Sequence, residues 1–231
     1  ETLRQSPNQV VYKARGRNGF RYAISRLIFT KSILVNPDTF DIVFLSDTRE
    51  SMGGLINSDQ DSSDAIQTAF LSRGDVRFWV GEYKDGNADA FGFRYNLEGE
   101  GTPILSNDAA AVSGAIGAWA ARGGEDFPED GLLGLCEVAS TAPWREGSRR
   151  MIFWFGDATG LDQRSDGTTM ATTLAALNEE CVQVIAVDLN GLDELGQAPE
   201  ITETILDCGL SGGLYWEVTS EEIEEEIDEI L

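Results

Sequence analysis

The chain has 231 residues, of which 42% are hydrophobic, so it is long enough to bury the core of one larger α/β domain. Forty acidic residues against 17 basic ones give a formal net charge of −23, which opposes binding to nucleic-acid phosphates and anionic lipids. The sequence contains no histidine, so histidine-based catalytic triads and imidazole metal sites are excluded. No apolar run approaches the ~20 residues of a membrane-spanning helix and no signal peptide opens the chain, so we expect a soluble or already processed segment without membrane insertion.

The first 38 residues are basic and β-prone. Seven of the 17 basic residues of the chain lie before Ser32. An Asn-Gly pair at residues 18 and 19 separates two β-prone runs, Val10 to Tyr12 and Phe20 to Ile24. Asn-Gly between such runs is the strongest short-range cue for a hairpin. We therefore predict that residues 1–38 form a basic β-hairpin extension packed on a main domain of residues 39–231.

The main domain begins with an apolar strand that ends in polar residues. Five of the six residues from Phe40 to Leu45 are apolar, which indicates a parallel strand covered on both faces. Asp47 and Ser51 follow it, and in open α/β sheets ligands bind beyond the carboxyl ends of the strands. An acid and a hydroxyl at this edge suit a hard cation. Capping of the next helix by the same two side chains is an equally good interpretation of this segment alone.

Strand and helix patterns alternate through the rest of the chain. We expect a helix after Ser62-Ser63-Asp64 up to Leu71, and further helices over 108–122, 130–141, 168–180, 198–208 and from 220 onward. Strands are expected over 76–83, 90–95, 150–156, 182–187 and 214–218. This alternation predicts an α/β fold with a doubly wound, mostly parallel central sheet, one antiparallel edge strand at 90–95, and helices on both faces.

The three cysteines lack the short paired spacings of zinc and redox motifs. Cys136 lies on the apolar side of a predicted helix and is expected in the core. Cys181 begins a predicted strand and Cys208 ends a predicted helix, at a sheet edge opposite the acidic loops, so we predict that these two lie close enough for a disulfide. Whether they are oxidised depends on the compartment.

Three segments together resemble a von Willebrand factor A domain, most closely its integrin β-subunit-like and bacterial branch. They are the strand and loop at 40–54 (FDIVFLSDTRESMGG), the loop at 123–130 (GGEDFPED) and the strand at 151–158 (MIFWFGDA). Their order and spacing match the family over about residues 38–219. The resemblance implies a Rossmann-like fold and a non-enzymatic module that binds a partner with the help of divalent cations.

The resemblance also implies two metal sites. The family's metal-ion-dependent adhesion site holds Mg²⁺, whose open position takes an acidic group from the partner; its matching residues here are Asp47, Ser51, Glu129 and Asp157. An auxiliary site in the integrin β-type domains holds Ca²⁺; its matching ligands here are Asp85, Asp126, the Pro128 carbonyl and Glu129. The cofactors implied are therefore Ca²⁺ at the auxiliary site and Mg²⁺ at the adhesion site.

Arg49 departs from the family pattern. It stands where the family has a second hydroxyl ligand, and a guanidinium donates hydrogen bonds but cannot coordinate a cation. Two outcomes remain open: Arg49 swings outward and water completes the metal shell, or its charge lies among Asp47, Glu129 and Asp157 in place of the ion. Its neighbours Thr48 and Glu50 are further candidates for contact with a ligand.

The function expected from these features is adhesion-type binding of a protein or glycan by a module of a larger bacterial extracellular protein, monomeric as an isolated domain. The first alternative is an intracellular A domain that serves as a scaffold in an ATPase-driven chelatase or chaperone assembly. The second is a degenerate A domain in which Arg49 replaces the metal. An enzyme with Asp47 as a phosphoryl nucleophile is disfavoured, because Arg49 occupies the place of the second aspartate of haloacid-dehalogenase-like phosphatases.

Overall fold

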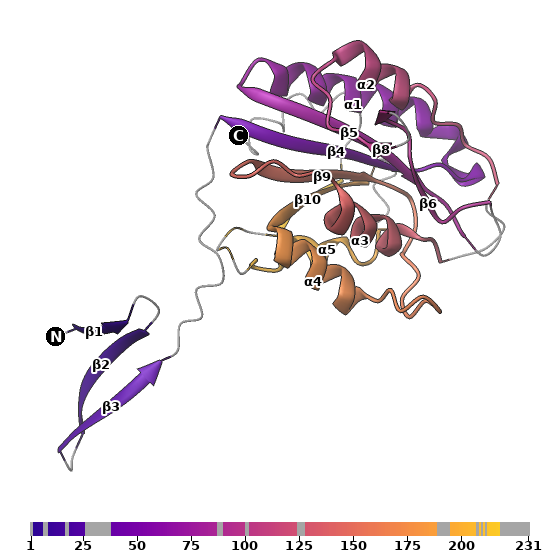
Figure 1. Ribbon diagram of the computed structural model, residues 1–231. Coiled ribbons are helices and arrows are strands. Elements are labelled where there is room, and N and C mark those ends of the chain that lie inside the picture. The colour runs from indigo at the N-terminus through magenta and orange to yellow at the C-terminus, as the bar shows by residue number, and fades with distance from the viewer. Residues whose placement is uncertain are drawn as a thin grey trace. The chain divides into compact units, whose positions relative to one another are not determined.

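The computed structural model describes residues 2–6, 9–16, 19–25, 38–86, 90–99, 102–123, 128–188, 195–206, 208, 210 and 212–217 (Figure 1). The chain divides into two compact units, Glu1–Ile33 and Leu34–Leu231. No helix within the described ranges is long and apolar enough to cross a membrane.

The first unit is a three-stranded antiparallel sheet of β1 (Thr2–Ser6), β2 (Gln9–Gly16) and β3 (Gly19–Ser25). The predicted hairpin corresponds to β2 and β3, which pair from Val10 with Ser25 to Gly16 with Gly19. Strand β1 was not predicted, because its sequence TLRQS contains a single apolar residue and carries no alternation signal. The packing of this extension on the main domain stays a prediction.

The second unit is built on a six-stranded sheet in the order β11-β10-β9-β4-β5-β6. Its strands are β4 (Thr39–Asp47), β5 (Asp75–Tyr83), β6 (Phe93–Tyr95), β9 (Arg149–Phe155), β10 (Val182–Asp188) and β11 (Gly213–Glu217). All neighbours pair in parallel except β6, which runs antiparallel to β5 at the edge. The predicted α/β fold with a mostly parallel sheet and one antiparallel edge strand is confirmed. Two short strands, β7 (Glu98–Gly99) and β8 (Thr102–Pro103), pair separately.

The helices are the 3₁₀ segment η1 (Glu50–Gly54), α1 (Ile56–Leu71), α2 (Ala109–Ile116), α3 (Gly131–Thr141), α4 (Met170–Glu180) and α5 (Ala198–Glu203). In Figure 1, α1 and α2 cover one face of the sheet, and α3 and α4 lie over the other. Phe70 of α1 packs edge-on against Phe40 of β4, with ring centroids 5.4 Å apart. On the other face, Gly134 of α3 lies against Leu45 of β4. Strand β4 is therefore buried on both faces, which explains its nearly continuous apolar run.

Three predicted helix boundaries were wrong. Helix α1 begins at Ile56, well before the predicted cap at residues 62–64, because Ser62 and Ser63 are buried on its inner face instead of capping it. Helix α2 ends at Ile116 before Gly117, short of residue 122, and α5 ends at Glu203, short of residue 208. The observed helix ends thus differ from the predicted ones, while the arrangement of helices on both faces of the sheet is as predicted. The acidic helix expected from residue 220 lies outside the described residues.

An arginine clamps the amino ends of β4 and β5. Arg145 Nε contacts Asp41 Oδ1 at 2.6 Å, and its Nη1 contacts Asp75 Oδ2 at 2.7 Å. Its Nη2 donates to the Phe40 carbonyl at 2.7 Å, and its backbone N–H donates to Asp41 Oδ2 at 2.6 Å. The Ser148 hydroxyl also donates to Asp41 Oδ2, at 2.7 Å. Both oxygens of the fully buried Asp41 are therefore hydrogen-bonded.

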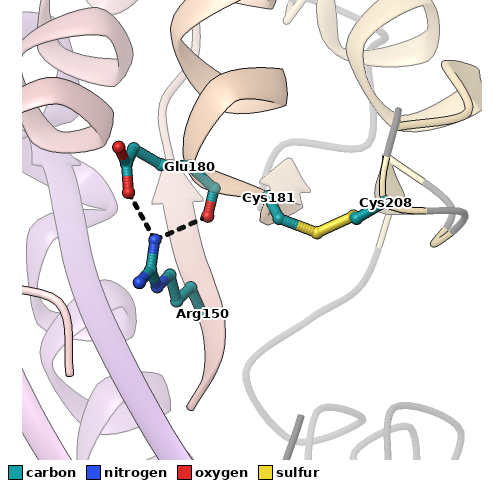
Figure 2. Close-up of a disulfide and its surroundings, with 4 residues drawn as sticks. All are labelled: Arg150, Glu180, Cys181 and Cys208. Atoms are coloured by element: carbon teal, nitrogen blue, oxygen red, sulfur yellow. Dashed lines mark hydrogen bonds and ion pairs between the residues drawn. A yellow bond between two sulfur atoms is a disulfide. The ribbon is translucent and has the colours of Figure 1, made fainter. Parts of the chain in front are cut away.

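A disulfide joins the end of α4 to the segment before β11. Cys181 follows α4 with a left-handed backbone (φ 55°), and its Cα lies 6.1 Å from that of Cys208, within the range that a disulfide spans. Figure 2 shows this bridge beside Arg150, whose Nη1 donates to the Glu180 carbonyl at 2.8 Å. The chain between the two cysteines is thus closed into a covalent loop. Cys136, on α3, is half-buried rather than in the core as predicted, and it is not bonded to another cysteine.

Candidate functional site

Three acidic side chains meet at the carboxyl edge of the sheet. Asp47 ends β4, and Asp157 follows the adjacent parallel strand β9. Glu129 reaches the same edge from the segment before α3, where its backbone N–H donates to the Thr159 carbonyl at 3.1 Å. Parallel neighbouring strands end at one edge, so these acids from three distant segments come together.

The side chain of Arg49 lies among these three acids. Its Nε is 3.3 Å from Asp47 Oδ2, its Nη1 is 2.6 Å from Glu129 Oε1, and its Nη2 is 3.1 Å from Asp157 Oδ1. The side chain is only 3% exposed, and those of Asp47 and Glu129 are 0% exposed. The backbone N–H of Arg49 also donates to Asp47 Oδ1 at 2.9 Å. Each guanidinium nitrogen therefore contacts a different carboxylate.

Burial dominates the electrostatics of this cluster, opposed chiefly by the charge of Arg49. Burial raises the pKa of Asp47 to about 6, against the opposing attraction of Arg49. Burial likewise raises the pKa of Glu129 to about 8, again opposed by Arg49 and reinforced by Asp47. For Arg49 burial would lower the pKa, but the three acids outweigh it and raise the pKa. One guanidinium thus faces three carboxyl groups, a surplus of acid that the described contacts do not balance.

The residues on either side of Arg49 point in different directions. The Thr48 hydroxyl is buried and donates to Glu82 Oε2 at 2.5 Å. Glu50 and Ser51 lie in η1 and are exposed at the surface. The predicted ligand Ser51 is therefore exposed, unlike Arg49, and Glu50 and Ser51 mark the solvent side of the cluster.

A buried lysine holds the surrounding loops together. Lys84, directly after β5, donates from Nζ to the carbonyls of Thr48 and Arg122. Backbone hydrogen bonds join the same segments, from Arg122 N to the Thr48 carbonyl at 3.1 Å and from Glu50 N to the Gly123 carbonyl at 2.9 Å. The sequence analysis missed Lys84. The signal for it was a lysine at the carboxyl end of a buried strand, next to the predicted ligand Asp85.

The predicted auxiliary set is described only in part. Asp85 and Glu129 are buried and Pro128 is half-buried, while Asp126 lies outside the described residues. Glu129 Oε2 is buried and has no hydrogen-bond partner among the described residues. In that part of the chain no group of three or more Asp, Glu, Cys or His side chains is arranged to hold a metal ion. The neighbouring Asp130 is engaged otherwise, accepting from Gly86 N at 2.8 Å.

A further buried acid lies behind the cluster. Asp59, in the first turn of α1, is fully buried and accepts from the Ser46 hydroxyl at 2.8 Å. Its other oxygen has no hydrogen-bond partner among the described residues, and burial raises its pKa well above 3.8. The sequence analysis missed this residue because the helix was expected to start later.

The adhesion-site residues do not fit Mg²⁺ in this arrangement. Magnesium needs oxygen ligands at about 2.0–2.1 Å in octahedral geometry. Here Asp47, Glu129 and Asp157 each place an oxygen on the guanidinium of Arg49 instead. A guanidinium offers only donors, so the space between the three acids is filled by a group that cannot coordinate a cation.

Solved structures share the fold at low sequence identity. The pilus adhesin SpaC from Lactobacillus rhamnosus GG matches with a TM-score of 0.55 and 12% identity, over 99% of this chain and 35% of SpaC. Proximal thread matrix protein 1 from the mussel byssus matches with a TM-score of 0.55 and 13% identity, over 83% of this chain and 47% of that protein. A mutant of the PilB minor pilin from Streptococcus sanguinis matches with a TM-score of 0.58 and 10% identity, over 100% of this chain and 76% of that chain.

The chain therefore spans about a third of SpaC and just under half of the byssus protein. No protein-family profile matches the sequence, and no curated protein matches it. The similarities establish a shared fold.

Proposed function

We propose that this chain is a non-enzymatic, adhesion-type binding module of the von Willebrand factor A class, part of a larger extracellular or cell-surface protein, with a protein or glycan as partner. The observation that carries the proposal is the convergence of Asp47, Glu129 and Asp157 at the carboxyl edge of the sheet. Ligands of open α/β sheets bind at this edge. The fold shared with a pilus adhesin and a minor pilin supports the same class of function.

The disulfide supports an extracellular location. Disulfides persist in oxidising compartments and are rare in the cytosol, where thiols are kept reduced. The bridge between Cys181 and Cys208 therefore favours a secreted or surface-exposed protein over the intracellular scaffold.

The partner surface in this proposal is the exposed rim beside the buried cluster. Glu50 and Ser51 are exposed there, whereas Arg49 is almost completely buried. A partner thus contacts the η1 segment without touching the three acids. Since the interface includes Glu50, basic or hydroxyl-rich partner groups complement it.

Calcium at the auxiliary position is a second part of the proposal. Calcium accepts irregular shells of carboxylate and carbonyl oxygens. Asp85, Glu129 and Pro128 supply groups of this kind, and the buried Glu129 Oε2 has no hydrogen-bond partner among the described residues. In this role calcium would supply positive charge beside acids that Arg49 alone does not neutralise.

The binding proposal is tested with the immobilised chain on arrays of extracellular-matrix proteins and of glycans. Replacing Glu50 by Arg reverses one exposed charge at the proposed rim. Replacing Glu146, exposed at the amino end of the sheet, by Arg is the matched control. We expect Glu50→Arg to weaken binding at least tenfold and Glu146→Arg to leave it within twofold, the tenfold loss being ~1.4 kcal/mol. Equal loss in both variants, or no partner on either array, contradicts the proposal.

A further inference from the structure

We infer that Arg49 is the resident cation of the carboxyl-edge site, so that the native chain holds Asp47, Glu129 and Asp157 together without a divalent ion. The inference deepens the proposed function and rests on it for the choice of site. Its test measures metal binding alone, so that failure of either idea can be recognised separately.

The guanidinium of Arg49 occupies the space between the three acids. The three nitrogens of Arg49 are 3.3, 2.6 and 3.1 Å from oxygens of Asp47, Glu129 and Asp157, respectively. A planar guanidinium suits several carboxylates at once, because its donors are directed outward in one plane. A cation bound by the same oxygens would have to occupy the volume that the guanidinium fills.

Arg49 is held at both its backbone and its side chain. Its N–H donates to Asp47 Oδ1 at 2.9 Å while its Nε contacts the other oxygen of the same carboxylate. Removing the side chain to solvent would leave three buried acids without their positive partner. Breaking one side of a buried ion pair is strongly destabilising, so the outward rotamer is disfavoured.

Hydrogen bonds from Lys84 and from the backbone link the loops around the cluster. Lys84 Nζ donates to the carbonyls of Thr48 and Arg122, which draws the loop after β4 to the segment after α2. Two backbone hydrogen bonds between Thr48 and Arg122 and between Glu50 and Gly123 join the same segments. Arg49 thus compensates the charge of the acids at this edge, and Lys84 links the loops, two roles that an ion would otherwise provide.

A consequence for the partner follows. Unlike a metal ion, the guanidinium of Arg49 offers no open coordination position. An acidic group of the partner is therefore not bound through a metal at this site. Binding should therefore survive removal of Mg²⁺, and the exposed η1 residues Glu50 and Ser51, rather than the buried acids, should determine it.

The test is calorimetric titration of the full chain with MgCl₂ and with MnCl₂. The variants are Arg49→Ser, which removes the guanidinium and adds a hydroxyl, and Arg145→Ser, which removes an arginine paired with two acids at the other end of the sheet. We expect Arg49→Ser to bind one more ion than the wild type, or to bind at least tenfold more tightly. Arg145→Ser should bind as the wild type does. Because any auxiliary site is common to all three proteins, the difference isolates Arg49.

Two outcomes overturn the inference: equal Mg²⁺ and Mn²⁺ binding by the wild type and Arg49→Ser, or equal gains in both serine variants. If Arg49→Ser does not fold, wild-type protein labelled with ¹⁵N and saturated with Ca²⁺ is titrated with Mg²⁺, which is diamagnetic and does not broaden signals from a neighbouring position. Unchanged amide shifts of residues 47–51 then support a site already filled by Arg49, and saturable shifts of those signals refute it. Arg49→Lys, which keeps the charge, is expected to gain no ion.

Discussion

The two ends of the central sheet each contain an acid-paired arginine, Arg49 being 3% and Arg145 19% exposed, but the two arginines face different balances of charge. At the amino end, Arg145 contacts two acids and two backbone carbonyls, and both oxygens of Asp41 accept hydrogen bonds. At the carboxyl end, Arg49 contacts three acids, and Glu129 Oε2 has no hydrogen-bond partner among the described residues. Arg145 therefore completes a structural clamp, whereas Arg49 leaves a surplus of negative charge.

This difference shows how to distinguish a structural ion pair from a site. In a structural ion pair the polar atoms are all hydrogen-bonded within the protein, so added ions have little effect on it. A cluster with more acids than cations keeps a latent affinity for positive charge, which burial strengthens because the dielectric constant is low. The same contrast ranks the following predictions.

The largest expected effect is the loss of Arg49. Arg49→Ala leaves three buried acids without a positive partner and should lower the free energy of unfolding by about 3–5 kcal/mol. Arg145→Ala removes hydrogen bonds to charged groups but keeps the Ser148 and backbone donors to Asp41, so about 1.5–3 kcal/mol is expected. Urea unfolding in excess chelator measures both values. A larger loss for Arg145→Ala would reverse the comparison.

The second effect is the loss of the disulfide. The double variant Cys181→Ser, Cys208→Ser should lose about 3.5 kcal/mol of stability, because the bridge closes a loop with a sequence separation of 27 residues. The bridge belongs to neither arginine cluster. The metal response of Arg49→Ser should thus persist in the reduced protein, and thermal unfolding with and without MgCl₂ measures it. Loss of that response on reduction would show that the two regions are coupled.

The third effect is stabilisation by calcium. If the auxiliary position binds it, calcium at about 100 times its dissociation constant should raise the stability of the wild type by about 2.7 kcal/mol. Differential scanning calorimetry with calcium and with chelator measures this. Asp85→Asn should abolish the response, whereas Asp41→Asn, at the amino end, should keep it. An unchanged melting temperature in the wild type refutes the calcium site.

The smallest effect concerns Asp59 and has a defined dependence on pH. Burial raises the pKa of Asp59 in the folded protein well above 3.8, its value in the unfolded chain. At a pH between 3.8 and the folded pKa, the folded state therefore keeps a proton that the unfolded chain has lost. The contribution of Asp59 to stability is therefore present below pH 3.8 and falls as pH rises toward the folded pKa. Asp59→Asn should gain about 1 kcal/mol at pH 7 and nothing near pH 3. Urea unfolding at the two pH values checks this, and a gain at acidic pH only would contradict it.

The sheet could be predicted from the sequence because its strands carry strong local signals. The apolar run of β4 and the alternation of strands and helices were enough to predict a parallel α/β core with an antiparallel edge. Helix ends were less predictable, since Ser62 and Ser63 have the same local appearance whether they cap a helix or lie buried within one. Strand β1 forms through pairing with β2 rather than through its own pattern.

For the candidate site, the sequence predicted the acids that converge but not how their charge is balanced. The order of segments indicated Asp47, Glu129 and Asp157, and in the structure all three contact one guanidinium. Whether the Arg49 side chain points outward or into the cluster was left open, because its rotamer depends on the surrounding charges. Lys84 and Asp59 were missed for a related reason: their burial arises from loops and helix starts that no local pattern specifies.

The disulfide also has a mechanical consequence. In the proposed adhesive role the chain is stretched when a surface and its partner are pulled apart, and unfolding lengthens it by the contour of the released chain. Cys181 and Cys208 are 27 positions apart, so their bond withholds roughly 90 Å of extended chain from the applied force. Peeling of β11 from the sheet edge would therefore stop at Cys208, before β10 bears the load. Single-molecule pulling should thus give a shorter total extension in the oxidised protein than in the reduced one.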